Sequence, residues 1–407
     1  MTPQELDAAD ALAHFRDRFA LPEGLIYLDG NSLGALPKAA EARVLETVRS
    51  EWGGGLITSW NKADWVGMPQ RIGDKIGRLI GARPGEVVAC DSTSINVFKA
   101  LTAAIALQPG RNVILSESGN FPTDIYIMQG IEALTGREVR AQMVQPDEVE
   151  GAIDDSVAAV MLTQVHYKTG KMRDMARVTE LAQDHGALMI WDLSHSAGAI
   201  PVDLAAANAD FAVGCGYKYL NGGPGAPGFL YVAERHQNAV TPALTGWFGH
   251  AAPFAFEDCY EPAPGIARFL IGTPPVLGMA ALEVGVDLFL EADMAAVRAK
   301  SISLSQLFSE RMAPLAERWG FALASPADPT ERGSQVSYRH PEGYAIMQAL
   351  IARGVIGDFR APDILRFGFT PLYTTHAEVA AAAGHIDAVM AAREWDRPEY
   401  KVRSAVT

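Results

Sequence analysis

The sequence predicts an α/β protein with a large domain on a mostly parallel sheet and a smaller C-terminal α+β domain. Three observations predict this class. Short apolar runs alternate with helical patterns in the central third, the links between them are short, and the pattern changes after about residue 275. A strand, a helix and a second strand joined by short links form the crossover unit of parallel sheets.

The strands of the large domain are predicted from apolar runs, which are typical of strands buried on both faces. These runs occupy residues 113–115, 158–165, 187–191, 211–215 and 229–232. A helix is predicted between the second and third runs, with Asp174 as N-cap and Gly186 at its C-terminal end. Its apolar face consists of Met175, Val178, Leu181 and Ala182.

The C-terminal part is predicted from a change of pattern. Residues 277–316 have the periodicity of one or two long amphipathic helices, and residues 334–338 and 365–369 indicate strands. The Gly-Thr-Pro-Pro segment before them breaks regular structure. We therefore expect an N-terminal segment, 1–45, that packs with the small domain, a large domain, 46–274, and a small domain, 275–407.

Composition excludes several classes of protein. Among 407 residues, 49% are hydrophobic and 20% charged, as in ordinary globular proteins. The three cysteines, Cys90, Cys215 and Cys259, form no close pair, which argues against a disulfide framework or a metal cluster and for a reducing compartment.

The net charge and the N-terminal sequence limit the kinds of ligand and the cellular location that we expect. The formal net charge of −14 disfavours nucleic-acid binding, so an anionic ligand needs local donors in a pocket. No run of ~20 apolar residues indicates a membrane span, and the N-terminus lacks the basic and apolar regions of a signal peptide. We expect a cytoplasmic protein that acts on a small molecule.

Two charged residues follow neighbouring predicted strands. Asp192 comes directly after an apolar run, and Lys218 follows the next run, with glycines at 214, 216, 222 and 223. Carboxyl ends of parallel strands meet at one sheet edge, where ligands bind. Alone, Asp192 could be a helix cap or a structural ion pair, and Lys218 a surface charge.

Together the two residues match the needs of pyridoxal 5′-phosphate (PLP). A lysine amine forms a Schiff base with this cofactor, and a carboxylate keeps its pyridine nitrogen protonated. His195 would brace Asp192 or the ring, or be a structural histidine. Thr93 and Ser94 fall in the first turn of a predicted helix, where free N–H groups bind phosphate or simply receive a cap.

Phe121 is a candidate platform for the cofactor ring, with Thr123 and Asp124 as polar neighbours, although a lone Phe is more often a core residue. Arg366, within a predicted strand, is a candidate for a substrate carboxylate, because a guanidinium gives two parallel hydrogen bonds.

At this point the sequence resembles the kynureninase family, PLP enzymes with the aspartate-aminotransferase-like fold (fold type I). Six runs in the same order carry the resemblance. They are LDGNSLG at 28–34, NFPTD at 120–124, WDLSHSAG at 191–198, YKYLNGGPG at 217–225, GWFGH at 246–250 and RFGFTPLY at 366–373.

The resemblance implies a fold with a seven-stranded-type sheet, and a hydrolase that cleaves the Cβ–Cγ bond of L-kynurenine. The products are anthranilate and L-alanine, with 3-hydroxykynurenine as a related substrate, in tryptophan catabolism or NAD biosynthesis. It also implies a homodimer with active sites at the interface. The implied cofactor contacts are Thr93, Ser94, Phe121, Thr123, Asp124, Thr163, Asp192, His195, Tyr217, Lys218, Trp247 and Thr273.

The implied mechanism gives roles to individual side chains. Lys218 removes the α-proton, Asp192 keeps the ring protonated, and Tyr217 is a candidate proton donor. Trp247 and Thr273 reach the phosphate of the neighbouring subunit's cofactor. Ser32, Trp60, Trp247 and His250 are candidates for the pocket around the aromatic end of the substrate.

Alternatives remain open at this level. A cysteine desulfurase or an aminotransferase shares the cofactor chemistry, but a desulfurase needs a reactive cysteine, and its ring platform is usually His where this chain has Phe121. A binding or regulatory module on the same fold would tend to lose the lysine or gain a DNA-binding domain. The preference between kynurenine and 3-hydroxykynurenine is not readable from the sequence.

Overall fold

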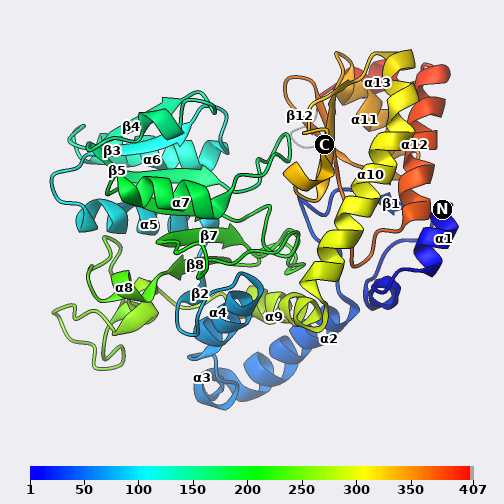
Figure 1. Ribbon diagram of the computed structural model, residues 1–407. Helices are drawn as coiled ribbons and strands as arrows, with labels where there is room; N and C mark the ends of the chain where they lie inside the picture. Colours follow the sequence, from blue (N-terminus) through cyan, green and yellow to red (C-terminus); the bar gives the residue numbers. More distant parts are fainter. Residues whose placement is uncertain (404–407) are drawn as a thin grey trace.

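A seven-stranded sheet forms the centre of the larger part of the molecule (Figure 1). The computed structural model describes residues 1–403. Along the sheet the order is β2-β8-β7-β6-β5-β3-β4, and only β8 runs antiparallel to its neighbours. The strands are β2 (Val87–Cys90), β3 (Val113–Glu117), β4 (Arg140–Val144), β5 (Val157–Thr163), β6 (Leu188–Asp192), β7 (Phe211–Cys215) and β8 (Gly228–Val232).

Helices cover both faces of this sheet because its central strands are apolar on both sides. In β6, Met189 and Trp191 belong to one buried cluster, and Leu188 and Ile190 to the other. The first cluster includes α4 (Met68–Leu79), α7 (Met175–Asp184) and α9 (Val276–Glu291), and the second includes α5 (Thr93–Leu107) and α6 (Pro122–Leu134).

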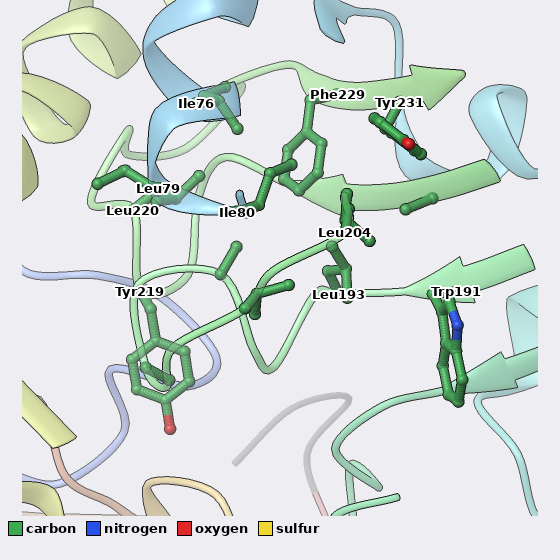
Figure 2. Close-up of a cluster of buried hydrophobic side chains, with 14 of the residues drawn as sticks. Ile76, Leu79, Ile80, Trp191, Leu193, Leu204, Tyr219, Leu220, Phe229 and Tyr231 are labelled. Carbon is green, nitrogen blue, oxygen red and sulfur yellow. The ribbon is translucent and has the colours of Figure 1, made fainter. Parts of the chain in front are cut away.

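Figure 2 shows part of the first cluster, where Ile76 and Ile80 of the helix α4 region lie beside Phe229 of β8, and Trp191 of β6 lies farther along the same cluster. Ile76 of α4 and Phe229 of β8 are fully buried. Trp191 is buried as well, and its indole N–H donates to Thr179 Oγ1 at 3.0 Å. The one polar atom of this large side chain is therefore satisfied inside the core.

The five predicted strands and the predicted helix are confirmed, with ends shifted by a few residues. The Asp174 carboxylate accepts from the Arg177 N–H at 3.1 Å, and Gly186 has φ +72° after the end of α7. Residues 277–316 fall into two helices, α9 and α10 (Met294–Trp319), because Asp293 caps a new helix.

A second sheet lies in the smaller C-terminal part. Its order is β12-β13-β10-β9, and all its pairings are antiparallel. Helices α10, α11 and α12 contribute to the core beside it. The elements are β9 (Ala322–Leu323), β10 (Gln335–Arg339), α11 (Gly343–Ala352), β12 (Asp358–Arg360), β13 (Ile364–Gly368) and α12 (His376–Ala391).

The N-terminal residues lie beside this smaller part (Figure 1). Strand β1 (Ile26–Tyr27) pairs in parallel with β11 (Val355–Ile356), and α1 (Pro3–Ala8) packs against α12. Helix α2 (Lys38–Glu46) packs against α9, which also packs against α4. The division into 1–45, 46–274 and 275–407 stays a prediction.

Short helical segments complete the described chain. Within residues 1–403, no helix is both long enough and apolar enough to cross a membrane. The short segments are η1 (Ala13–Arg18), η2 (Thr47–Gly55), η3 (Leu56–Thr58), α3 (Ser59–Lys62), η4 (Glu150–Ala152), α8 (Glu234–Gln237), η5 (Trp247–Gly249), η6 (Gly265–Phe269), η7 (Pro329–Glu331), η8 (Glu394–Asp396) and α13 (Pro398–Lys401).

Helix α4 approaches β2 so closely that only glycine fits at position 73. A Cβ there would overlap the Val87 carbonyl and lie 2.7 Å from Val88 Cα. We expect Gly73→Ala to destabilise the protein by about 1–3 kcal/mol, measured as a lower midpoint of thermal unfolding, because overpacking forces the helix off the strand.

Gly130→Ala is the matched control, because Gly130 is in helix α6 and a Cβ there meets nothing within 4 Å. This variant should gain about 0.5–1 kcal/mol from the better helix propensity of Ala. Equal effects of the two substitutions would contradict the close packing of α4 on β2.

Candidate active site

A cavity of about 550 Å³ opens at the carboxyl ends of β5, β6 and β7. It collects residues that are far apart in the sequence, as the parallel strand order requires. Of the predicted site residues, Thr93, Ser94, Phe121, Thr123, Thr163, Asp192, His195, Tyr217, Lys218 and Thr273 line it.

Asp192 and Lys218 lie in the same buried cavity. Asp192 ends β6 and is 2% exposed, and Lys218 follows β7 and is 8% exposed. The Asp192 carboxylate accepts from the Ser194 N–H at 2.7 Å. Lys218 Nζ lies 3.1 Å from His195 Nε2 and 5.5 Å from the centre of the Phe121 ring. The amine therefore faces the space beside that ring.

The N-terminus of α5 forms another wall of the cavity. Ser92 caps the helix, and Thr93 and Ser94 are its first residues. First-turn N–H groups have no partner within a helix, so they are donors for an anion. Gly228 lies against this turn: a Cβ there would be 3.2 Å from Thr93 N and 2.8 Å from the Gly214 carbonyl. Only glycine permits this close approach.

Phe121 is positioned by a polar network behind it. The Asn120 side-chain oxygen accepts from the Phe121 N–H at 2.7 Å and from the Thr163 hydroxyl. The Phe121 ring meets the Tyr167 ring edge-on, with centroids 5.2 Å apart. The platform is thus held by neighbours on β5 and on the segment after it.

Two buried carboxylates lack a full set of partners. Neither oxygen of Asp124 accepts a hydrogen bond from any residue in 1–403, and its side chain is completely buried. Burial, reinforced by the Asp192 charge and opposed by Lys218, raises the pKa of Asp124 well above its usual range. Burial also raises the pKa of Asp192, against the Ser194 hydrogen bond and Lys218.

The two carboxylates and the start of α5 together fit a ligand that has a cationic nitrogen heterocycle and a phosphate. Asp124 and Asp192 bring two carboxylates against the single lysine, Lys218, among the cavity residues, which favours a ligand with a protonated ring nitrogen. The helix N-terminus with its two hydroxyl residues suits a phosphate. Asp124 itself does not line the cavity and acts on it from behind.

The pKa values of His195 and Tyr217 shift in opposite directions, and each side chain is neutral at pH 7. Burial and the Lys218 charge lower the pKa of His195 well below its ordinary value, so its ring is neutral at pH 7. Its Nδ1 has no partner among the described residues. Burial raises the pKa of Tyr217, so the phenol keeps its proton. Both can therefore serve as hydrogen-bonding groups at neutral pH.

Arg366 and Ser32 lie together just behind the cavity. The Arg366 guanidinium is 1% exposed and donates to the Tyr167 carbonyl at 2.8 Å, to Ser32 Oγ at 2.6 Å and to Asp358 at 2.5 Å. Tyr167 lines the cavity, so Arg366 contacts its wall. Burial lowers the pKa of Arg366, against the Asp358 charge.

Trp60, Trp247 and His250 lie apart from the Lys218 cavity. The Trp60 and Trp247 rings are 6.1 Å apart, and Trp247 is 37% exposed. Trp247 and His250 line a second cavity of about 390 Å³, and His250 Nε2 lies 3.1 Å from the Cys259 carbonyl. A single chain does not bring these three side chains to the lysine.

The sequence reasoning missed Tyr167 and Asp358. Tyr167 follows the carboxyl end of β5, so the rule that pointed to Asp192 could have indicated it. Asp358 carries no signal, because it meets Arg366 only through the pairing of β12 with β13. Within residues 1–403, no group of three or more His, Cys, Asp or Glu could hold a metal ion.

Comparison with solved structures defines the class of protein. A cysteine desulfurase from Thermococcus onnurineus NA1 superimposes with a TM-score of 0.77 at 18% identity, over 93% of this chain and 98% of that chain. A C-DES mutant, whose structure has glycine covalently linked to the PLP cofactor, gives 0.76 at 18% identity, over 91% and 98%. The fold is therefore that of the PLP-dependent enzymes of fold type I, as predicted.

Sequence comparison gives the family. Kynureninases of Burkholderia pseudomallei (strain 1106a) and Pseudomonas fluorescens are each 51% identical over 407 residues, 99% of this chain and 98% of theirs. Residues 297–386 match the kynureninase C-terminal domain, and residues 70–209 match the DegT/DnrJ/EryC1/StrS aminotransferase family. The chain belongs to the kynureninase family, which confirms the resemblance read from its motifs.

The raised pKa of Asp124 predicts a pH-dependent stability cost. Above its ordinary value of 3.8 the unfolded carboxyl loses its proton while the folded one retains it, so the folded state becomes less stable as pH rises. Asp124→Asn should therefore raise the thermal midpoint of the cofactor-free protein near pH 8 by ~1 °C or more, since about 1 kcal/mol moves the midpoint of a chain of this length by ~1 °C.

The difference should shrink as the pH falls and vanish well below 3.8, where the unfolded wild type is protonated as well. Asp155→Asn is the control, because the Asp155 side chain is fully exposed, and it should show no such trend. A gap that widened as pH fell would contradict the raised pKa of Asp124.

Proposed function

We propose that the protein is a kynureninase that hydrolyses the Cβ–Cγ bond of L-kynurenine to give anthranilate and L-alanine. It is a hydrolase acting on C–C bonds in ketonic substances, and its cofactor is PLP. The observation that carries the proposal is the meeting of Lys218 and Asp192 in one buried cavity with the N-terminus of α5, in a chain of the kynureninase family.

The described residues suggest how the cofactor is held. Asp192 would face the ring nitrogen, Phe121 the ring, and Thr93 and Ser94 the phosphate. Bound PLP supplies an electron-accepting ring that stabilises negative charge at the substrate α-carbon. Asp124 and Thr163 would support these contacts from the side of Asn120 and β5.

Lys218 would carry the cofactor and then transfer protons. Its Nζ lies in the cavity, where a free amine can remove the proton from the α-carbon. Neutral His195 has its Nε2 within hydrogen-bond distance of that amine, 3.1 Å away, and would hold it in place. Water must add to the γ-carbonyl of the substrate before the Cβ–Cγ bond breaks. Tyr217 keeps its proton and is the candidate to donate a proton to the alanine fragment.

Arg366 would bind the α-carboxylate of the substrate. Its orientation is fixed by Asp358, Ser32 and the Tyr167 carbonyl, so the guanidinium is rigid before the substrate arrives. The aromatic end of the substrate would lie towards Ser32, Trp60, Trp247 and His250.

A desulfurase or aminotransferase function is not favoured. Family membership over nearly the whole chain points to kynureninase. Cys215 lines the cavity, but burial raises the pKa of its thiol. Burial also raises the pKa of the Cys90 thiol, to about 12. Both thiols therefore stay protonated and are weak nucleophiles. Cys259 is exposed and does not line the cavity.

We also propose that the enzyme is a cytoplasmic homodimer with active sites at the interface. Trp247 supports this idea, because it lies outside the Lys218 cavity of its own chain and is partly exposed, free to reach a second chain. Tryptophan catabolism is the proposed pathway, with supply of NAD biosynthesis as a further role, and 3-hydroxykynurenine is a proposed second substrate.

Lys218→Ala tests the assignment of the reaction. The variant should lose at least ~10³-fold in turnover, followed by anthranilate fluorescence with kynurenine and added PLP, because the amine that transfers the α-proton is gone. The visible absorption of lysine-bound cofactor should disappear. Exposed Lys171→Ala is the control and should keep both signals; full activity of Lys218→Ala would rule out the proposed site.

Mixed dimers test the interface. If Trp247 contacts the neighbouring chain's cofactor, Trp247→Ala alone should be impaired about tenfold or more, as expected for a lost hydrogen bond to a charged group. Mixing it with Lys218→Ala chains should then restore activity, because each mixed dimer contains one site with both native residues. No restoration from two separately impaired variants would mean that Trp247 acts within its own chain.

A further inference from the structure

A buried lysine lies directly behind the proposed phosphate wall. Lys99 is in α5 and is 0% exposed. Its Nζ forms an ion pair with Asp91, donates to the Phe269 carbonyl at 2.6 Å and lies 3.6 Å from Cys90 Sγ. Such a charge is tolerated inside a protein only when it is paired and hydrogen-bonded.

Its partner Asp91 belongs to the cavity. Asp91 lines it, at the turn between β2 and α5, and has a left-handed backbone with φ +48°. The Asp91 carbonyl accepts from the Gly228 N–H at 2.8 Å, which ties the turn to β8. A carboxylate beside a phosphate is repulsive unless a cation offsets it. Since burial keeps the Cys90 thiol neutral, with a pKa of about 12, Asp91 is the anion that Lys99 contacts.

The hydrogen bond from Lys99 to the Phe269 carbonyl connects the helix to a second wall of the cavity. Phe269 ends the short helix η6, and Thr273, which lines the cavity, follows shortly after it. Lys99 therefore connects the turn at the start of α5 to the segment that leads to Thr273. The first segment is proposed to face the phosphate, and the second lines the same cavity at Thr273.

We propose that Lys99 is a positioning residue for the cofactor phosphate: it offsets the charge of Asp91 and holds the turn at the start of α5 against the cavity wall that carries Thr273. The inference rests on the proposed function, in which PLP is the cofactor. Lys99 does not line the cavity and acts through Asp91 and the Phe269 carbonyl. Without it, a poorly compensated carboxylate would face a dianionic phosphate.

The test compares PLP with pyridoxal, which lacks the phosphate. Cofactor-free Lys99→Met should bind PLP about tenfold more weakly or worse, as expected when one member of a buried charge pair is removed. Its affinity for pyridoxal should match that of the wild type. Equal weakening for both ligands would indicate general loss of structure and overturn the proposal. Affinity is measured by absorbance titration.

The chain offers a closely matched control. Lys300 is also buried, pairs with Asp10 at 2.6 Å and donates to the Pro371 carbonyl at 2.6 Å, but does not line the cavity. Lys300→Met should lower the thermal midpoint, as Lys99→Met does, and leave PLP affinity unchanged. A comparable loss of PLP affinity in both variants would show that the effect comes from stability alone.

Two further variants test the charge balance, and the first of them keeps the test decisive if Lys99→Met does not fold. Asp91→Asn removes the repulsive charge and keeps Lys99, so it should bind PLP more tightly than the wild type. Lys99→Met combined with Asp91→Asn should recover most of the affinity lost in the single Lys99 variant. Weaker binding by Asp91→Asn, or no recovery in the double variant, would overturn the charge-offset role. Failure of the wild type to bind PLP would instead refute the proposed function.

Discussion

The burial of two carboxylates beside one lysine is the constraint around which this site is built. Asp124 and Asp192 lose their water, and burial raises the pKa of each. Lys218 alone among the cavity residues offers them a positive charge. The arrangement costs stability in the empty protein, and a protonated ring nitrogen would relieve it. Stability is thus exchanged for affinity and for control of proton transfer, as is usual in active sites.

The two parts of the molecule meet at the segment that follows β5. The Tyr167 carbonyl accepts from Gln335 of β10 at 3.0 Å and from Arg366 of β13 at 2.8 Å, while its ring packs against Phe121. The proposed carboxylate-binding residue and the proposed ring platform therefore share one neighbour. A shift of the smaller sheet would move both, which couples substrate binding to the placement of the cofactor.

Much of the fold could be predicted because the central strands carry a strong signal. Strands β5, β6 and β7 are completely buried and read as apolar runs. Strand β4 was not predicted, because it lies at the sheet edge and none of its residues is fully buried. Strand β2 was not predicted either, because it has only four residues. Short and edge strands gain their stability from pairing rather than from local composition.

The sequence by itself determined the chemistry of the site: a carboxylate and a lysine after consecutive strands, and hydroxyl residues at a helix start. Strand direction alone places these at one edge, so no long-range knowledge was needed. Only the tertiary structure decided which side chains face the cavity and which support it. Asp358 reaches Arg366 through strand pairing, and Lys99 reaches Phe269 through packing. Such contacts depend on distance in space, which local sequence patterns do not encode.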